Sequence, residues 1–225
     1  MNMLRIVWGR VEERRLPALA DAFGAATQGR PTPDGLIAWH LGMRAVGDHH
    51  EVAGVTVWES VENALAAFAD DVASNRTLAE LDRVATFSGA AVYEIEGASV
   101  RAASHETVAL RVATGILPSG HETEILSEMR RRLTSIGSDA VEAYVGRRMV
   151  GRGVEAVFVS LWEGAPDLRR LDDPIWPDLA ELKADFAVRT FVAARGGVSA
   201  SARAQLPATD FAPDTDSLER AAAAG

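Results

Sequence analysis

The sequence predicts an α+β fold present twice, as two βαββαβ units of about a hundred residues each. The first observation is an internal repeat: VTVWES at residues 55–60 returns as VSLWEG at 159–164, and three further segments return in the same order. The second is that the apolar periodicity of each half alternates between that of strands and that of helices. The third is that 225 residues with 48% hydrophobic content can bury two modest cores or one joint core.

The other repeated segments set the halves in register. They are 4–9 with 110–115, 34–42 with 139–146, and 78–81 with 179–182, where LAEL recurs unchanged. We therefore expect a tandem repeat with units at 1–97 and 107–195, a linker at 98–106, and a flexible tail at 196–225 that is poor in apolar residues.

The first half is expected to begin with a strand near its N-terminus. A helix follows, with the apolar stripe Leu16, Leu19, Ala20 and Phe23. Two strands are then joined by a short glycine-containing loop at 44–50. Ser60 can cap a second helix, which carries Ala64, Leu65, Phe68 and Val72. Residues 90–95 are expected to form the closing strand.

The second half repeats this order. A strand is expected at 107–114, followed by a helix with the inward stripe Ile125, Met129, Leu133 and Ile136. The next two strands are joined by a loop at 147–153. The second helix is broken, because it contains Pro166, Pro174 and Pro177. Residues 187–193 are expected to close the unit.

A βαββαβ unit forms an antiparallel sheet with both helices on one face. The other face needs a cover, and two copies in one chain can cover each other, sheet against sheet. We therefore expect a pseudo-dimer within one chain, present either as a monomer or as a homodimer.

Composition excludes several classes of function. The net charge of -9 and the absence of a basic stripe argue against nucleic acid as a partner. With no cysteine, the chain has no disulfide and no thiolate metal site. No apolar run approaches the roughly 18 residues that a membrane helix needs. We expect a cytoplasmic protein without a membrane partner.

Alternation along the repeated strands defines two faces. One is purely apolar, with Val55, Val57, Val157, Val159 and Leu161, and is expected to pack under the helices. The other carries Gly54, Thr56 and Trp58, or Phe158, Ser160 and Trp162. Small hydroxyl side chains beside a large aromatic ring favour a pocket for a small molecule.

This order of elements, with a strand ending in Val-x-Val-Trp-Glu-Ser before a helix, resembles the dimeric α+β barrel superfamily. More narrowly, it resembles the antibiotic-biosynthesis-monooxygenase group, over residues 3–96 and 107–194. The resemblance implies two ferredoxin-like repeats packed sheet to sheet as an intramolecular pseudo-dimeric α+β barrel. It also implies that Trp58 and Trp162 line substrate cavities.

The chain departs from the heme-degrading members of that group. Their asparagine on the first strand would fall on Gly9 or Gly115, and no histidine is found near Phe68 or Asp172. We therefore expect neither a resident cofactor nor a metal site.

The candidate catalytic residues are His40, as a general base, and Trp58, which orients the substrate. The candidate substrate-binding residues are Trp8, Trp39, Thr56, Arg5, Trp162 and Arg111. Each has a structural alternative: the tryptophans can be core, His40 can be a hydrogen-bonding core group, and the two arginines can form salt bridges across the barrel. Val145 is placed near the position of His40, so the second half lacks a titratable group there.

Two functions are compatible with these residues. The first is a cofactor-independent monooxygenase acting on a small aromatic or quinol-type substrate. The alternative is a non-catalytic module of the same fold that binds a small ligand or heme, or serves as a scaffold.

Overall fold

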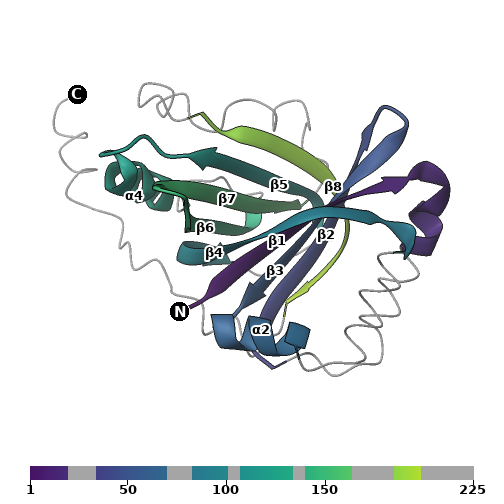
Figure 1. The fold of residues 1–225 in the computed structure, drawn as a ribbon, viewed down its shortest axis with the longest axis horizontal. Coiled ribbons are helices and arrows are strands. Elements are labelled where there is room, and N and C mark those ends of the chain that lie inside the picture. Colours follow the sequence, from purple (N-terminus) through teal and green to yellow (C-terminus); the bar gives the residue numbers. More distant parts are fainter. Residues whose placement is uncertain (20–33, 70–82, 101–106, 134–139, 164–184, 199–225) are drawn as a thin grey trace, which may run out of the picture.

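The protein is described by a computed structural model that covers residues 1–19, 34–69, 83–100, 107–133, 140–163 and 185–198 (Figure 1). The first half contains β1 (Met3–Glu12), the 3-10 helix η1 (Glu13–Arg15), β2 (Leu36–Val46), β3 (His49–Trp58), α2 (Val61–Ala69) and β4 (Thr86–Val100). The second half contains β5 (Thr107–Ile116), α4 (Glu122–Leu133), β6 (Ala140–Val150), β7 (Gly153–Glu163) and β8 (Ala187–Val198). The expected tail lies mostly outside the described residues.

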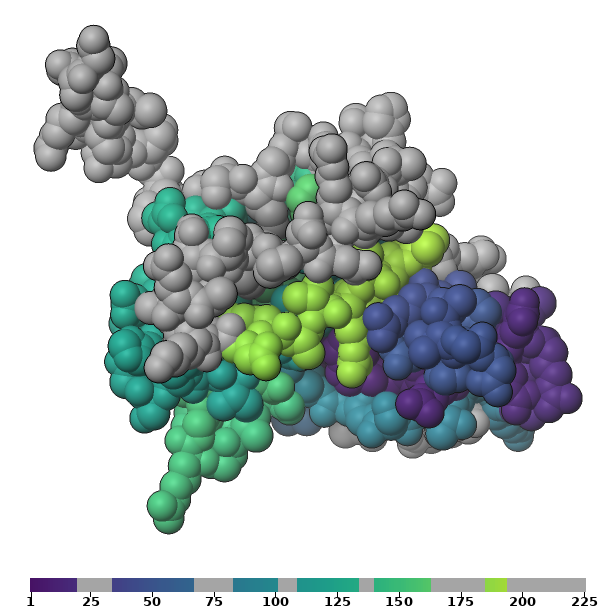
Figure 2. Space-filling model, turned by 90° about the horizontal axis from the view of Figure 1, so that it is seen from above, coloured from purple at the N-terminus to yellow at the C-terminus, as the bar shows by residue number. Residues whose placement is uncertain are grey.

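The strands form one closed antiparallel barrel in the order β1-β3-β2-β8-β5-β7-β6-β4. Each half contributes four neighbours in the same order, β4-β1-β3-β2 and β8-β5-β7-β6. This is the strand order of a ferredoxin-like unit, and the halves join through β2–β8 and β4–β6. In Figure 2 the yellow-green β8 runs beside the blue segment of the first half. The predicted pseudo-dimeric α+β barrel is confirmed.

The closing strands are longer than the sequence predicts. β4 extends to Val100 and pairs with β6, and β8 extends to Val198 and pairs with β2. The added residues, EGASV at 96–100 and ARGGV at 194–198, show no regular alternation of apolar side chains, so periodicity gave little sign of a strand. They form ladders because the edge of the other half offers unpaired backbone groups.

The two hairpins are tighter than expected. Gly47 and Gly151 have φ of 62° and 60°, and each begins a two-residue turn. Glycine adopts this left-handed conformation without steric cost. The adjacent residues His49 and His50 therefore begin β3 and do not lie in a loop.

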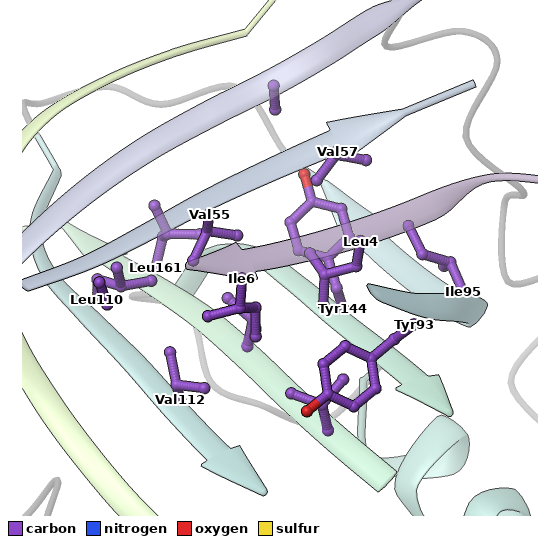
Figure 3. Packing of buried hydrophobic residues seen from close by; sticks show 14 of the residues in the cluster. Leu4, Ile6, Val55, Val57, Tyr93, Ile95, Leu110, Val112, Tyr144 and Leu161 are labelled. Atoms are coloured by element: carbon purple, nitrogen blue, oxygen red, sulfur yellow. The ribbon is translucent and has the colours of Figure 1, made fainter. Parts of the chain in front are cut away.

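The apolar face of the repeated strands lies inside the barrel, and the prediction that it packs under the helices is wrong. Val55, Val57 and Leu161 form one cluster with residues from both halves, as Figure 3 shows. The other members labelled there are Leu4, Ile6, Tyr93, Ile95, Leu110, Val112 and Tyr144. The face that carries Trp58 and Trp162 is therefore the helix-side face.

Helix α4 covers the helix-side face of the second half. Its buried residues are Ile125, Leu126, Met129 and Leu133, which include three of the four predicted stripe residues. They pack against Phe158 and Val145. Ile136 lies outside the described residues.

In the first half, Ser60 caps α2 as predicted, accepting a hydrogen bond from the Asn63 N–H at 3.1 Å. Ala64 of α2 is buried, whereas Leu65 is exposed. Within the described ranges, no helix has the length and apolar character needed to cross a membrane.

Candidate functional site on the helix side of the first half

Ladder register brings three predicted site residues side by side on β1, β3 and β2. Thr56 lies opposite Arg5 on one side and opposite Trp39 on the other. Directly opposed residues share a face and have Cβ atoms about 4.5–5.5 Å apart. Trp58 and Gly54 lie two residues away from Thr56 along β3, so they share that face too.

The indole of Trp58 is held in place by its own strand. Its Nε1–H donates to the Thr56 Oγ1 at 2.9 Å, and only 2% of the residue is exposed. The second half repeats the arrangement, since Trp162 Nε1–H donates to Ser160 Oγ at 3.0 Å. Arg111 lies opposite Ser160, as Arg5 lies opposite Thr56. The two tryptophans therefore occupy equivalent positions.

The halves differ in what fills this face. Phe158 lies opposite Ala113 and Val145 in its ladders, and Gly54 lies opposite Val7 and Leu41. Phe158 and Gly54 therefore hold equivalent positions. The Phe158 ring is fully buried under α4. Gly54 has no ring, and a Cβ at this position would meet no described atom closer than the Val7 Cβ at 4.0 Å.

Exposure follows this difference. In the first half, Arg5, Val7, Trp39, Gly54 and Thr56 are all half-buried. In the second half, the residues at the corresponding ladder positions are buried: Arg111, Ala113, Ala143, Phe158 and Ser160. The tryptophans run the other way, since Trp58 is buried and Trp162 is half-buried. At the positions of Arg5, Trp39 and Thr56, accessible polar and aromatic surface therefore remains in the first half, whereas their counterparts in the second half are buried.

Arg5 supplies the charge of this site. Its partial burial lowers the pKa of the guanidinium, because burial disfavours the charged form. A guanidinium still remains protonated at neutral pH and can only donate hydrogen bonds. A bound anion would accept hydrogen bonds from it in addition to its contacts within the protein.

His40 does not join these residues. It lies opposite Val55, so its side chain points into the barrel, on the other face of the sheet from Trp58. Its Nε2 is 3.0 Å from Glu142 Oε2, which also accepts a hydrogen bond from the Tyr144 hydroxyl at 2.8 Å. All three residues are buried.

The ladder also corrects the comparison between halves. Tyr144 lies opposite Val159 as His40 lies opposite Val55, so Tyr144 is the counterpart of His40. The sequence comparison placed Val145 there, because it aligned the nine residues 34–42 with the eight residues 139–146 and shifted this part of the strand by one position. Both counterparts bind the single carboxylate of Glu142.

Trp8 also lies on a different face from Arg5, Thr56 and Trp58. It lies opposite Ala53, on the barrel face, and its ring centroid is 6.1 Å from that of Phe191. The Arg189 guanidinium stacks over the ring of Trp8 at 4.8 Å. Trp8 is therefore part of the packing of the barrel interior.

Sequence reasoning missed Glu142. It is the one acidic residue in the apolar run AVEAYVG at 140–146, which was a signal of a buried polar contact. The repeat did place Gly54 at the position of Phe158 in the comparison of the halves, but the difference in size between them was not used. Among the described residues, there is no cluster of three or more histidine, cysteine, aspartate or glutamate side chains that could hold a metal ion.

At Gly9 the structure explains why no larger side chain is present. A Cβ there would lie 3.0 Å from Phe87 Cδ1 and 3.1 Å from Val52 Cγ2. Phe87 therefore occupies the volume that a side chain on this part of β1 would need.

No family model and no curated protein matches the sequence. Solved structures do match. A candidate monooxygenase from Fusobacterium nucleatum aligns with a TM-score of 0.69 at 11% identity, over 88% of this chain and 94% of that one. An anthrone oxidase-like protein aligns with a TM-score of 0.62 at 11% identity, over 88% and 94% of the two chains.

A candidate monooxygenase from Lactobacillus acidophilus aligns with a TM-score of 0.62 at 13% identity, over 88% of this chain and 97% of that one. At such identities the likeness concerns the fold. The alignments span nearly the whole length of those chains. This chain therefore has the pseudo-dimeric α+β barrel fold of the monooxygenase-like proteins.

Proposed function

We propose that the helix-side face of the first half binds a small aromatic ligand, and that the protein oxidises it with molecular oxygen without a resident cofactor. The observation that carries the proposal is the exchange of Phe158 for Gly54. Arg5, Trp39 and Thr56 are half-buried around Trp58, whereas their counterparts Arg111, Ala143 and Ser160 in the second half are buried. Similar folds in a candidate monooxygenase and an anthrone oxidase-like protein support the reaction class.

The chemistry asks little of the protein. An aromatic substrate with an acidic methylene can lose a proton and pass electrons to oxygen. One oxygen atom enters the product as a carbonyl, and the other leaves as water with the two hydrogens. The protein would position the ring against Trp58 and Trp39, and Arg5 would stabilise the ionised substrate.

His40 was the expected base, but the sheet separates it from Thr56 and Trp58. This separation favours a second candidate function, a module that binds the ligand without turnover. In the first candidate, Arg5 replaces the base by lowering the pKa of the bound substrate, so that solvent can take the proton.

The test uses anthrone, whose oxidation to anthraquinone consumes one oxygen molecule and releases one water. Binding is followed by tryptophan fluorescence quenching, and turnover by oxygen uptake and anthraquinone absorbance. Gly54→Phe copies the second half into the first and should abolish both signals while the protein stays folded. Trp162→Phe is the matched control in the filled half and should change neither.

Binding without oxygen uptake would select the second candidate function. Binding that is unchanged in Gly54→Phe would contradict the proposed site. Thermal unfolding of each variant shows whether a loss of signal reflects the site or the fold.

A further inference from the structure

The polar groups of the proposed site differ in what they can offer a ligand. The indole N–H of Trp58 is used, since it donates to Thr56 Oγ1. A threonine hydroxyl has one proton and two lone pairs. One lone pair of Thr56 accepts from the indole, so its proton is directed away from Trp58 and can be donated to a ligand.

Arg5 adds only donors. Its guanidinium carries five N–H groups and no acceptor, so it can serve a ligand in addition to a partner within the protein. It lies opposite Thr56 in the β1–β3 ladder, so the donors of both residues belong to one short stretch of the face.

From this inventory we infer that the site selects an aromatic anion, with a carboxylate or phenolate oxygen bound by Arg5 and Thr56 and the ring against Trp58. A neutral hydrocarbon would take water away from these donors and give no acceptor in return. An aromatic amine would bring its own donors against them. The inference rests on the proposed function, because it specifies the ligand of that same site.

Ser160 in the second half provides the control for a substitution of Thr56. Ser160 accepts from Trp162 as Thr56 accepts from Trp58, yet it is fully buried. Loss of the hydroxyl removes the same intrachain hydrogen bond in both halves. Only in the first half should it also remove a ligand contact.

The experiment measures the affinity of the full-length protein for four probes: 1-naphthoate, 1-naphthol, 1-naphthylamine and naphthalene. We expect 1-naphthoate to bind at least about tenfold more tightly than naphthalene or 1-naphthylamine, since hydrogen bonds to charged groups are the stronger ones. Thr56→Val and Arg5→Met should each remove about tenfold of the 1-naphthoate affinity and leave naphthalene unchanged. Thr56→Ser should restore it, and Ser160→Ala should have no effect.

Two failures are distinguishable. Equal affinity for all four probes at a site that Gly54→Phe abolishes would overturn the selection of anions and leave the proposed site standing. Absence of binding by every probe, or binding unaffected by Gly54→Phe, would overturn the proposed function together with this inference. An unchanged preference for 1-naphthoate in Arg5→Met would also overturn it.

Discussion

The contact of His40 with Glu142 inside the barrel predicts a strong energetic coupling between the two halves. His40 Nε2 and Glu142 Oε2 are 3.0 Å apart, and the exposed fractions of the two residues are 3% and 5%. An uncompensated charge at such depth is costly, so we expect the pair to be net neutral. His40→Leu takes the imidazole from a buried carboxylate and should cost about 3–5 kcal/mol of unfolding free energy.

Glu142→Leu should cost less, about 1–3 kcal/mol, because it leaves behind groups that can be neutral. The double variant replaces both groups by apolar side chains in an apolar cluster. Its cost should fall below the sum of the single costs by about 2 kcal/mol. For a domain of this size, 1 kcal/mol corresponds to about 2–4 °C in Tm.

The assay is urea unfolding of the wild type, both single variants and the double variant at neutral pH. Tyr144→Phe, which removes only the second donor to Glu142, serves as a control with a smaller loss of about 1 kcal/mol. Additive costs, with a coupling below about 0.5 kcal/mol, would refute the contact as a link between the halves.

Two further predictions concern stability. Gly42→Ala should cost about 1–3 kcal/mol by overpacking, because its Cβ would lie 2.6 Å from the Phe191 Cβ. Gly89→Ala, whose Cβ would meet no atom of the described residues within 4 Å, should be nearly neutral. Equal Tm values for the two variants would contradict the packing. The hydrogen bond from Arg131, supported by Arg132, lowers the pKa of Glu128 to about 2. Since the folded pKa lies below the unfolded value, Glu128 stabilises the protein above about pH 4.5 and this contribution is lost as the pH falls toward 2. Glu128→Gln should therefore be less stable than the wild type at pH 7, by under about 1 kcal/mol because solvent screens the ion pairs. The difference should vanish near pH 2. A constant difference in the free energy of urea unfolding across that pH range would contradict the assignment.

The sequence repeat was enough to predict the order of strands and the equivalence of Trp58 and Trp162. It did not decide which face of the sheet points inward. Alternation separates two faces, but here both are covered, one by the helices and one by the other half. An apolar face such as that of Val55 and Val57 fits either environment, so the choice depends on closure of the barrel, which is a long-range property.

Register accounts for the other errors. A one-residue shift in a strand moves every side chain to the opposite face. The sequence comparison made Val145 the counterpart of His40, whereas the ladders give that position to Tyr144. The irregularity between Leu36 and Ala38 and the one between Ala140 and Glu142 fall at equivalent positions of the two halves, so the second strands correspond without a gap in the structure.

Some of the candidate site residues share one face of the sheet, and their role in binding stays a prediction. Arg5, Trp39, Thr56 and Trp58 lie together because cross-strand neighbours of one face follow from alternation. His40 and Trp8 were grouped with them because they are polar or aromatic residues on nearby strands. Their faces depend on register, and the register places them inside the barrel.

The central claim is that the helix side of the first half holds the ligand and that the second half is filled. The most direct test is a crystal structure of the full-length protein with 1-naphthoate. We predict one ligand per chain, with its ring against Trp58 and its carboxylate at Arg5 and Thr56. Ligand bound beside Trp162, or inside the barrel at His40, would contradict the claim.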